Sequence, residues 1–189
     1  MRDAMTGVGA DHLEALYAAT DDPWGFRSSA YEQAKFAATR AALSLPRYRS
    51  GLEIGCGNGE LARHLAPLCT SYHGVDAVER ALAAARCTVP EGRFHRVHLP
   101  GRLPGGAHDL IVLSEILYFL DPAGIAALAG QIGHRWPGAE LVCVTWLGPT
   151  GHALQGEEAY DLFRLASSRP FRPAARTRFY RIDVSQGAS

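Results

Sequence analysis

The chain has 189 residues, of which 47% are hydrophobic, and this length favours one ordinary domain with a sizeable buried core. Its nineteen basic and nineteen acidic residues cancel, so no overall field draws in nucleic acid or an anionic membrane. No stretch reaches the roughly 18 apolar residues of a membrane span, and the N-terminus lacks the apolar region of a signal peptide. We therefore expect a cytoplasmic protein with no nucleic-acid partner and no membrane insertion.

The spacing of cysteines and histidines argues against disulfides and metal sites. The four cysteines, Cys56, Cys69, Cys87 and Cys143, are far apart and form no CxxC pair. No pair of histidines has the spacing of metal ligands. We expect reduced cysteines and no bound metal.

The predicted elements begin with two helices and continue as an alternation of strands and helices. The helices cover residues 11–19 and 29–44, and Ser29 and Glu32 have the spacing of a capping box. After Arg49, short apolar runs alternate with helical segments, which is typical of a mostly parallel sheet. The expected strands are 51–54, 72–76, 93–98, 109–114 and 140–146, with helices near 59–68, 78–87, 122–135 and 154–167, and a last edge strand in TRFYRIDVS.

The segment LEIGCGNGEL, residues 52–61, joins a predicted strand to a predicted helix through glycines at every second position. Gly55, Gly57 and Gly59 allow a ligand to approach the backbone closely, where a Cβ would block it. The dinucleotide fingerprint G-x-G-x-x-G has its third glycine one residue later, and Glu60 is a poor neighbour for a pyrophosphate at a helix N-terminus. The spacing therefore argues against NAD or FAD.

An acidic residue, Asp76, ends the next predicted strand. In an α/β sheet this position, 23 residues after Glu53, suits a carboxylate that binds two ribose hydroxyls. The alternative is purely structural: the glycines form a tight turn, and Asp76 caps the helix that begins near Val78. Because both features occur on successive strands, a ribose-containing ligand is the favoured interpretation.

Together, these motifs resemble a known superfamily. Glu53-x-Gly55-x-Gly57-x-Gly59 followed by Asp76 resembles motifs I and II of the class I S-adenosylmethionine-dependent methyltransferases, over roughly residues 48–148. Four further segments resemble its nodulation protein S (NodS) branch: DPWGFRSSAYEQAKFAAT, SEILYFLD, TWLGPTGHALQGEEAYDLF and YRIDV. The resemblance implies an α/β, Rossmann-like class I methyltransferase fold with a mostly parallel, seven-stranded sheet and helices on both faces. It also implies one domain over 1–189, with an N-terminal helical lid (1–47) and a cofactor-binding core (48–189).

The resemblance implies S-adenosylmethionine as cofactor and S-adenosylhomocysteine as product. The glycine loop would lie under the methionine and ribose, Asp76 would bind the ribose, and His98 and Leu99 would flank the adenine. Trp24 would help to wall the methyl pocket, and Arg27 would pair with the cofactor carboxylate; the alternatives are a core Trp24 and a solvated Arg27. The whole implied cofactor set is Glu53, Gly55, Cys56, Gly57, Gly59, Asp76, Ala77, Ser114, Arg27, Trp24, His98 and Leu99.

The catalytic candidates are Glu115, His152 and Tyr31. Glu115 follows an apolar strand, where it could hold an amine or take its proton; alternatively, it caps the next turn or binds the cofactor's amino group. His152 follows the fifth predicted strand and could accept a proton, or be an ordinary surface residue. Tyr31 would close the methyl pocket, and Tyr118 is interpreted as core packing. Six arginines between Arg164 and Arg181 indicate a solvated face or, alternatively, a patch for a phosphorylated acceptor.

The resemblance further implies N-methylation of a free amino group on an amino sugar or oligosaccharide-type acceptor by a monomer or weak homodimer. The alternative is an O- or S-methyltransferase for another small metabolite. A cofactor-binding module without catalysis and a nicotinamide oxidoreductase are rivals from other classes. A neutral acceptor would have less use for Glu115, which separates the first two hypotheses.

Overall fold

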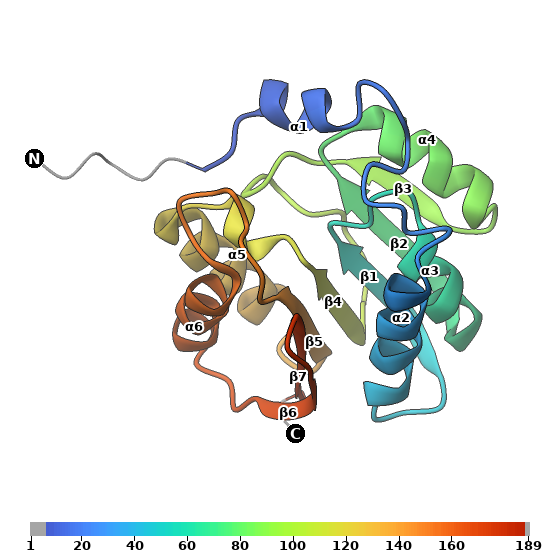
Figure 1. Ribbon diagram of the computed structural model, residues 1–189. Helices are drawn as coiled ribbons and strands as arrows, with labels where there is room; N and C mark the ends of the chain where they lie inside the picture. The colour runs from blue at the N-terminus through green and yellow to red at the C-terminus, as the bar shows by residue number, and fades with distance from the viewer. Residues whose placement is uncertain (1–6, 188–189) are drawn as a thin grey trace, which may run out of the picture.

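A computed structural model describes residues 7–187 as one seven-stranded sheet with helices on both faces (Figure 1). The strand order is β3-β2-β1-β4-β5-β7-β6. Strands β1 to β5 are paired in parallel, whereas β7 runs antiparallel to both β5 and β6. This arrangement confirms the α/β class I methyltransferase fold expected from the sequence.

The strands are β1 Tyr48–Ile54, β2 Cys69–Asp76, β3 Arg93–Arg96, β4 Leu110–Ser114, β5 Glu140–Trp146, β6 Arg172–Arg176 and β7 Tyr180–Ser185. The α-helices are α1 Ala10–Leu16, α2 Ala30–Ala42, α3 Glu60–Leu65, α4 Glu79–Thr88, α5 Pro122–Arg135 and α6 Gly156–Ser167. Two short 3-10 helices, η1 Ala66–Leu68 and η2 Leu117–Phe119, complete the elements. No helix within residues 7–187 is long and apolar enough to cross a membrane.

The sheet is the middle layer of three (Figure 1). Side chains alternate between the faces of each strand, so β4 and β5, which are apolar at almost every position, supply core residues to both sides. Leu113 and Leu141 pack toward α5 and α6, whereas Val112 and Val142 pack toward the face that carries α2, α3 and α4. The carboxyl ends of the parallel strands are therefore fixed between two packed layers.

The C-terminal edge of the sheet differs from the expectation. The segment TRFYRIDVS contains β7, which is not an edge strand because β6 pairs with its outer side. The sequence RPAAR of β6 gives no apolar alternation, contains Pro173 and is mostly exposed. Arginine and proline are common on edge strands, where half of the backbone groups face water, and such strands lack the usual sequence signal.

The two N-terminal helices have different positions. Helix α1 lies across the carboxyl ends of the central strands (Figure 1), ends at Leu16 rather than at residue 19, and has no buried residue of its own. Helix α2 packs against a face of the sheet and buries Lys35, Phe36 and Thr39. The Ser29 side chain accepts a hydrogen bond from the Glu32 amide, as the capping box predicts.

Candidate active site

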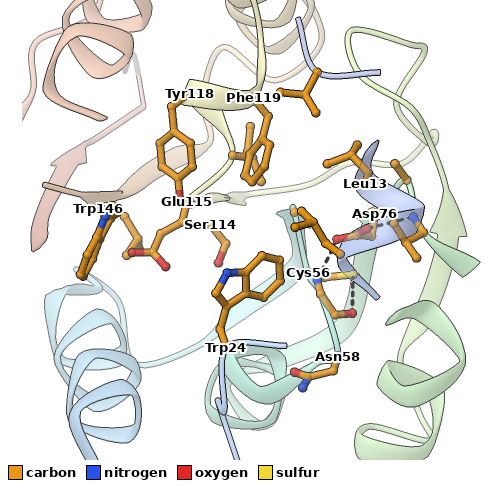
Figure 2. Close-up of a pocket in the computed structure, with 18 of the residues that line it drawn as sticks. Leu13, Trp24, Cys56, Asn58, Asp76, Ser114, Glu115, Tyr118, Phe119 and Trp146 are labelled. Atoms are coloured by element: carbon orange, nitrogen blue, oxygen red, sulfur yellow. Dashed lines mark hydrogen bonds between the residues drawn. The ribbon is translucent and has the colours of Figure 1, made fainter. Parts of the chain in front are cut away.

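A cavity of about 630 Å³ opens at the carboxyl ends of β1, β2 and β4, beneath α1. This edge is where open α/β sheets bind their ligands. The glycine loop and Asp76 line one side, the end of β4 lines the middle, and Trp146 lies at the other side (Figure 2). Twelve of the fifteen predicted site residues line this cavity: Trp24, Glu53, Gly55, Cys56, Gly57, Asp76, Ala77, His98, Leu99, Ser114, Glu115 and His152.

Each of the three glycines of the loop is required for a different structural reason. All have positive φ, which glycine tolerates best. A Cβ at Gly57 would lie 3.3 Å from the Tyr17 hydroxyl and 3.7 Å from the Phe26 ring, two side chains that line the cavity, so this glycine permits their close approach to the loop. A Cβ at Gly55 would collide with Ile116, and one at Gly59 would lie 2.9 Å from the Ala85 backbone. Gly59 does not line the cavity; it permits close packing of the loop against α4.

Asp76 is held in the cavity by backbone amides. Its Oδ2 accepts a hydrogen bond from the Gly57 amide and its Oδ1 accepts one from the Val78 amide, both at 3.0 Å. Burial raises the pKa of Asp76, and the backbone hydrogen bonds oppose this shift. The capping and ligand-binding interpretations are therefore compatible, because an oxygen that accepts one amide retains a second lone pair for a hydroxyl.

Glu53 lies behind the glycine loop and is completely buried. The Tyr72 hydroxyl donates to its Oε2 at 2.9 Å, while Oε1 has no hydrogen-bond partner among residues 7–187. Burial raises the pKa of Glu53 to about 8, against the opposing hydrogen bond of Tyr72. The Glu53 carboxyl group is therefore much harder to ionise than that of a free glutamate side chain.

At the other end of the cavity, Glu115 forms part of a buried group of three charges. The Lys35 ammonium lies 2.8 Å from Glu115 Oε2 and 2.7 Å from Glu32 Oε2, and its side chain is only 1% exposed. Burial raises the pKa of Glu115, with Lys35 opposing the shift. Burial alone would lower the pKa of Lys35, but the two carboxylates outweigh it and raise that pKa. The group therefore places one ammonium between two carboxyl groups.

The sequence analysis missed Lys35 and interpreted Glu32 only through the cap. The backbone amide of Glu32 does serve the cap, but its carboxylate turns toward Lys35. One signal was available: Lys35 is the only lysine of the chain and precedes the apolar Phe36. Its partner Glu115 is eighty residues away in the sequence, so helical spacing could not have identified the pair.

His152 enters the cavity among aromatic rings. Its ring centroid lies 4.6 Å from that of Phe119 and 5.8 Å from that of His12, which comes from α1. Burial and the neighbouring His12 lower the pKa of His152, which favours the neutral imidazole, the form that can accept a proton. Tyr118 also lines the cavity, where Figure 2 shows its ring extending toward Glu115, in addition to packing on the core.

The cavity wall is more aromatic than the sequence analysis expected. Trp24 lines it as expected and stacks on Phe26, with ring centroids 5.5 Å apart. Trp146, Phe119 and Tyr17 were missed as lining residues. Figure 2 shows Trp146 beside Glu115 at the side of the cavity opposite Asp76. Aromatic surface excludes water and strengthens electrostatic interactions within the site.

Two predicted site residues point elsewhere. The Arg27 guanidinium donates two hydrogen bonds to the Asp21 carboxylate, at 2.8 and 2.9 Å, and does not line the cavity. Tyr31 also lies outside the cavity lining, and its ring packs edge-on against Phe179 and Tyr180 of the β7 region. A single helical position separates Tyr31 from Glu32, which sets these two side chains on different faces of α2.

The six C-terminal arginines do not form a common anion site. Arg176 and Arg181 pair with Glu157, and Arg169 donates to backbone carbonyls. The solvated and structural interpretation is therefore the better one for this segment. Within the described residues, no group of three or more His, Cys, Asp or Glu could hold a metal ion.

Comparisons with known proteins agree with the motifs. A family model for Nodulation protein S (NodS) matches residues 9–130. A nodulation protein S from Sinorhizobium fredii is 30% identical over 156 residues, which cover 80% of this chain and 68% of the relative. Another, from Bradyrhizobium diazoefficiens, is 30% identical over 161 residues, which cover 77% of this chain and 74% of the relative.

A solved structure shares the fold over almost the whole chain. It is the N-methyltransferase NodS from Bradyrhizobium japonicum in complex with S-adenosylhomocysteine, which matches with a TM-score of 0.80 and 21% identity over 95% of this chain and 99% of that one. The family resemblance read from the glycine loop and Asp76 is thereby confirmed. Since the family model spans more than half of its length, the chain belongs to the nodulation protein S family of class I S-adenosylmethionine-dependent methyltransferases.

Proposed function

We propose that the protein transfers a methyl group from S-adenosylmethionine to a free amino group of an amino sugar or oligosaccharide-type acceptor. The observation that carries this proposal is the Glu115 side chain, which lines the same cavity as Asp76, pairs with Lys35 through Oε2 and has no hydrogen-bond partner for Oε1 among residues 7–187. A carboxylate with one free oxygen suits an ammonium or amine donor. The relatives support the N-methyl assignment, and a hydroxyl or thiol acceptor is not favoured.

The residues present fit the cofactor. Asp76 offers two preoriented oxygens for ribose hydroxyls, and Gly55, Cys56 and Gly57 of the loop line the cavity beside it. His98 and Leu99 line the cavity where an adenine would need an apolar wall and backbone groups. When bound, S-adenosylmethionine supplies an electrophilic methyl group and leaves as S-adenosylhomocysteine.

The acceptor residues then have two tasks. An amine attacks through its lone pair, so an incoming ammonium must first lose a proton. Glu115 can hold the ammonium through a charge-assisted hydrogen bond, and neutral His152 can take the proton. Trp146, Tyr118 and Phe119 keep water from this end of the cavity.

Several finer features belong to this proposal. Residues 7–47 would act as a lid, since α1 covers the cavity, although α2 packs on the sheet itself; residues 1–6 of the expected lid lie outside the described residues. The acceptor would be a small molecule or oligosaccharide, the protein a monomer or weak homodimer, and the reaction cytoplasmic. No nucleic acid takes part.

The test combines cofactor binding with a matched pair of acceptors. Calorimetry with S-adenosylmethionine and S-adenosylhomocysteine measures affinity, and mass spectrometry measures methylation of a glucosamine oligomer beside its fully N-acetylated counterpart. The proposal expects a mass gain of one or more methyl groups only on the free amine. Methylation of both acceptors would indicate a hydroxyl target, and cofactor binding without any product would favour a binding module.

A further inference from the structure

The only lysine of the chain lies where a lysine is costly to place. The Lys35 side chain is 1% exposed on the buried face of α2, although burying an unpaired ammonium costs several kcal/mol. It is paired with Glu32 from its own helix and with Glu115 from the end of β4. If the side chain at position 35 were needed only for packing, an apolar residue would fill the space at a lower cost.

The backbone of Glu115 is unusual as well. Its φ is +54°, a left-handed conformation that few residues other than glycine adopt. Its amide nevertheless donates to the Val144 carbonyl at 3.0 Å, so the strand pairing continues up to this residue. The strained turn directs the Glu115 side chain toward Lys35 and the cavity instead of continuing the strand. Such strain persists where the surrounding contacts fix it, which is frequent at functional sites.

The two carboxylate oxygens of Glu115 have different surroundings. Oε2 accepts a hydrogen bond from Lys35 at 2.8 Å, whereas the buried Oε1 has no partner among residues 7–187. Rotation of the carboxylate is therefore limited by Lys35, which holds Glu115 in place among the residues that line the cavity. Figure 2 shows this carboxylate between Trp146 and Ser114.

We propose that Lys35 is the positioning residue that keeps Glu115 ionised and aimed at the acceptor amine. This inference rests on the proposed function and adds the device that makes the amine site work. Without the ammonium, an isolated carboxylate in this apolar cavity would prefer its neutral form and lose its attraction for a cation.

The charged and titratable groups around Glu115 set the direction of the effect. Lys35 and Glu32 face it from α2, with the Tyr31 ring 5.8 Å from the Lys35 ammonium, and Tyr118 faces it from η2. Lys35 lowers the pKa of Glu115, whereas burial and Glu32 raise it. Removing Lys35 should therefore shift the ionisation of Glu115 to higher pH, and neutralising Glu32 should shift it to lower pH.

The experiment is the pH profile of kcat/KM for the amine acceptor at saturating cofactor. Lys35→Met should move the acidic limb of this pH profile to higher pH, by about one pH unit or more. Lys35→Arg should leave it close to that of the wild type, and Glu32→Gln should move it downward. The ionisation of the acceptor is common to all variants and cancels in the comparison.

The control is Arg40→Met, which removes a positive charge from the same helix. Arg40 is exposed and forms no ion pair within residues 7–187. The substitution should leave the limb in place. Calorimetry with S-adenosylhomocysteine and thermal unfolding establish that each variant is folded.

If Lys35→Met is folded and the acidic limb of its pH profile does not move, the inference is overturned, even if kcat is lower. Lys35 would then have only a structural role. If Lys35→Met does not fold, Lys35→Gln decides, because it removes the charge but keeps a hydrogen-bond donor: an upward shift of the acidic limb supports the inference and no shift overturns it. Failure of the proposed function looks different, because the wild type itself would then methylate no amine at any pH.

Discussion

The two ends of the cavity are built in different ways. At the Asp76 end, one carboxylate is held by the amides of Gly57 and Val78, and every group comes from two adjacent βα turns. At the Glu115 end, the carboxylate is held by the side chain of Lys35, from a helix eighty residues away in the sequence. The first end is assembled by local backbone geometry, and the second depends on tertiary packing of α2 against the sheet.

This difference has an energetic consequence. Backbone amides are present whatever the side chains are, so the Asp76 end tolerates changes elsewhere in the fold. The Glu115 end depends on its pairing with Lys35, because removing one partner of a buried ion pair leaves an uncompensated charge. We expect cofactor binding to be the more robust property and acceptor use the more variable one.

The largest expected effect breaks the Asp76 end. Asp76→Ala removes acceptors for two ribose hydroxyls, each charge-assisted bond contributing about 1.5–3 kcal/mol, so the affinity for S-adenosylhomocysteine should fall roughly 10²- to 10⁴-fold. Calorimetry measures this loss. Asp121→Ala is the matched control, because Asp121 also accepts a backbone amide, that of Gly124, but lies outside the cavity lining. Equal losses in both variants would mean that Asp76 acts only on stability.

The next effect separates the two ends. Glu115→Gln keeps the shape of the side chain but removes its charge and its capacity to accept a proton. Turnover of the amine acceptor should fall about 10²-fold or more, whereas the affinity for S-adenosylhomocysteine should stay within about threefold. Steady-state kinetics beside calorimetry give both numbers. Little loss of turnover would disfavour an amine acceptor.

A smaller effect concerns the frame of the Asp76 end. Gly59→Ala places a Cβ 2.9 Å from the Ala85 backbone at a φ of +82°, and should lower the free energy of unfolding by about 2–4 kcal/mol. Gly130→Ala is the control in α5, where a Cβ meets nothing within 4 Å and helix propensity should raise stability by about 0.5–1 kcal/mol. Denaturant unfolding compares them. If the Gly59→Ala protein is stable but no longer binds the cofactor, Gly59 contributes directly to the ligand site.

The smallest effects are expected for substitutions of residues that the sequence analysis predicted in the site but that lie outside the cavity lining. Arg27→Ala and Tyr31→Phe should each change cofactor affinity and turnover by less than about threefold. Arg27 is engaged by Asp21 on the surface, and an exposed ion pair contributes about 1 kcal/mol or less. A loss of affinity beyond tenfold in Arg27→Ala would mean that the guanidinium turns into the cavity when ligand binds.

The sequence determined the fold and the Asp76 end by itself. Alternating apolar runs and helices indicate a parallel sheet, and Gly55, Gly57 and Asp76 lie at fixed offsets from strands β1 and β2, so local spacing predicts their place at the sheet edge. Edge strand β6 was missed because its exposed RPAAR segment has no apolar period.

Only the tertiary structure decided the other end of the cavity. It set Tyr31 and Arg27 outside the lining, brought Trp146 and Phe119 into it, and joined Lys35 to Glu115. The physical reason is that backbone patterns repeat within a turn or a strand, whereas a contact between side chains on distant elements depends on how whole layers pack. A local pattern carries no information about that packing.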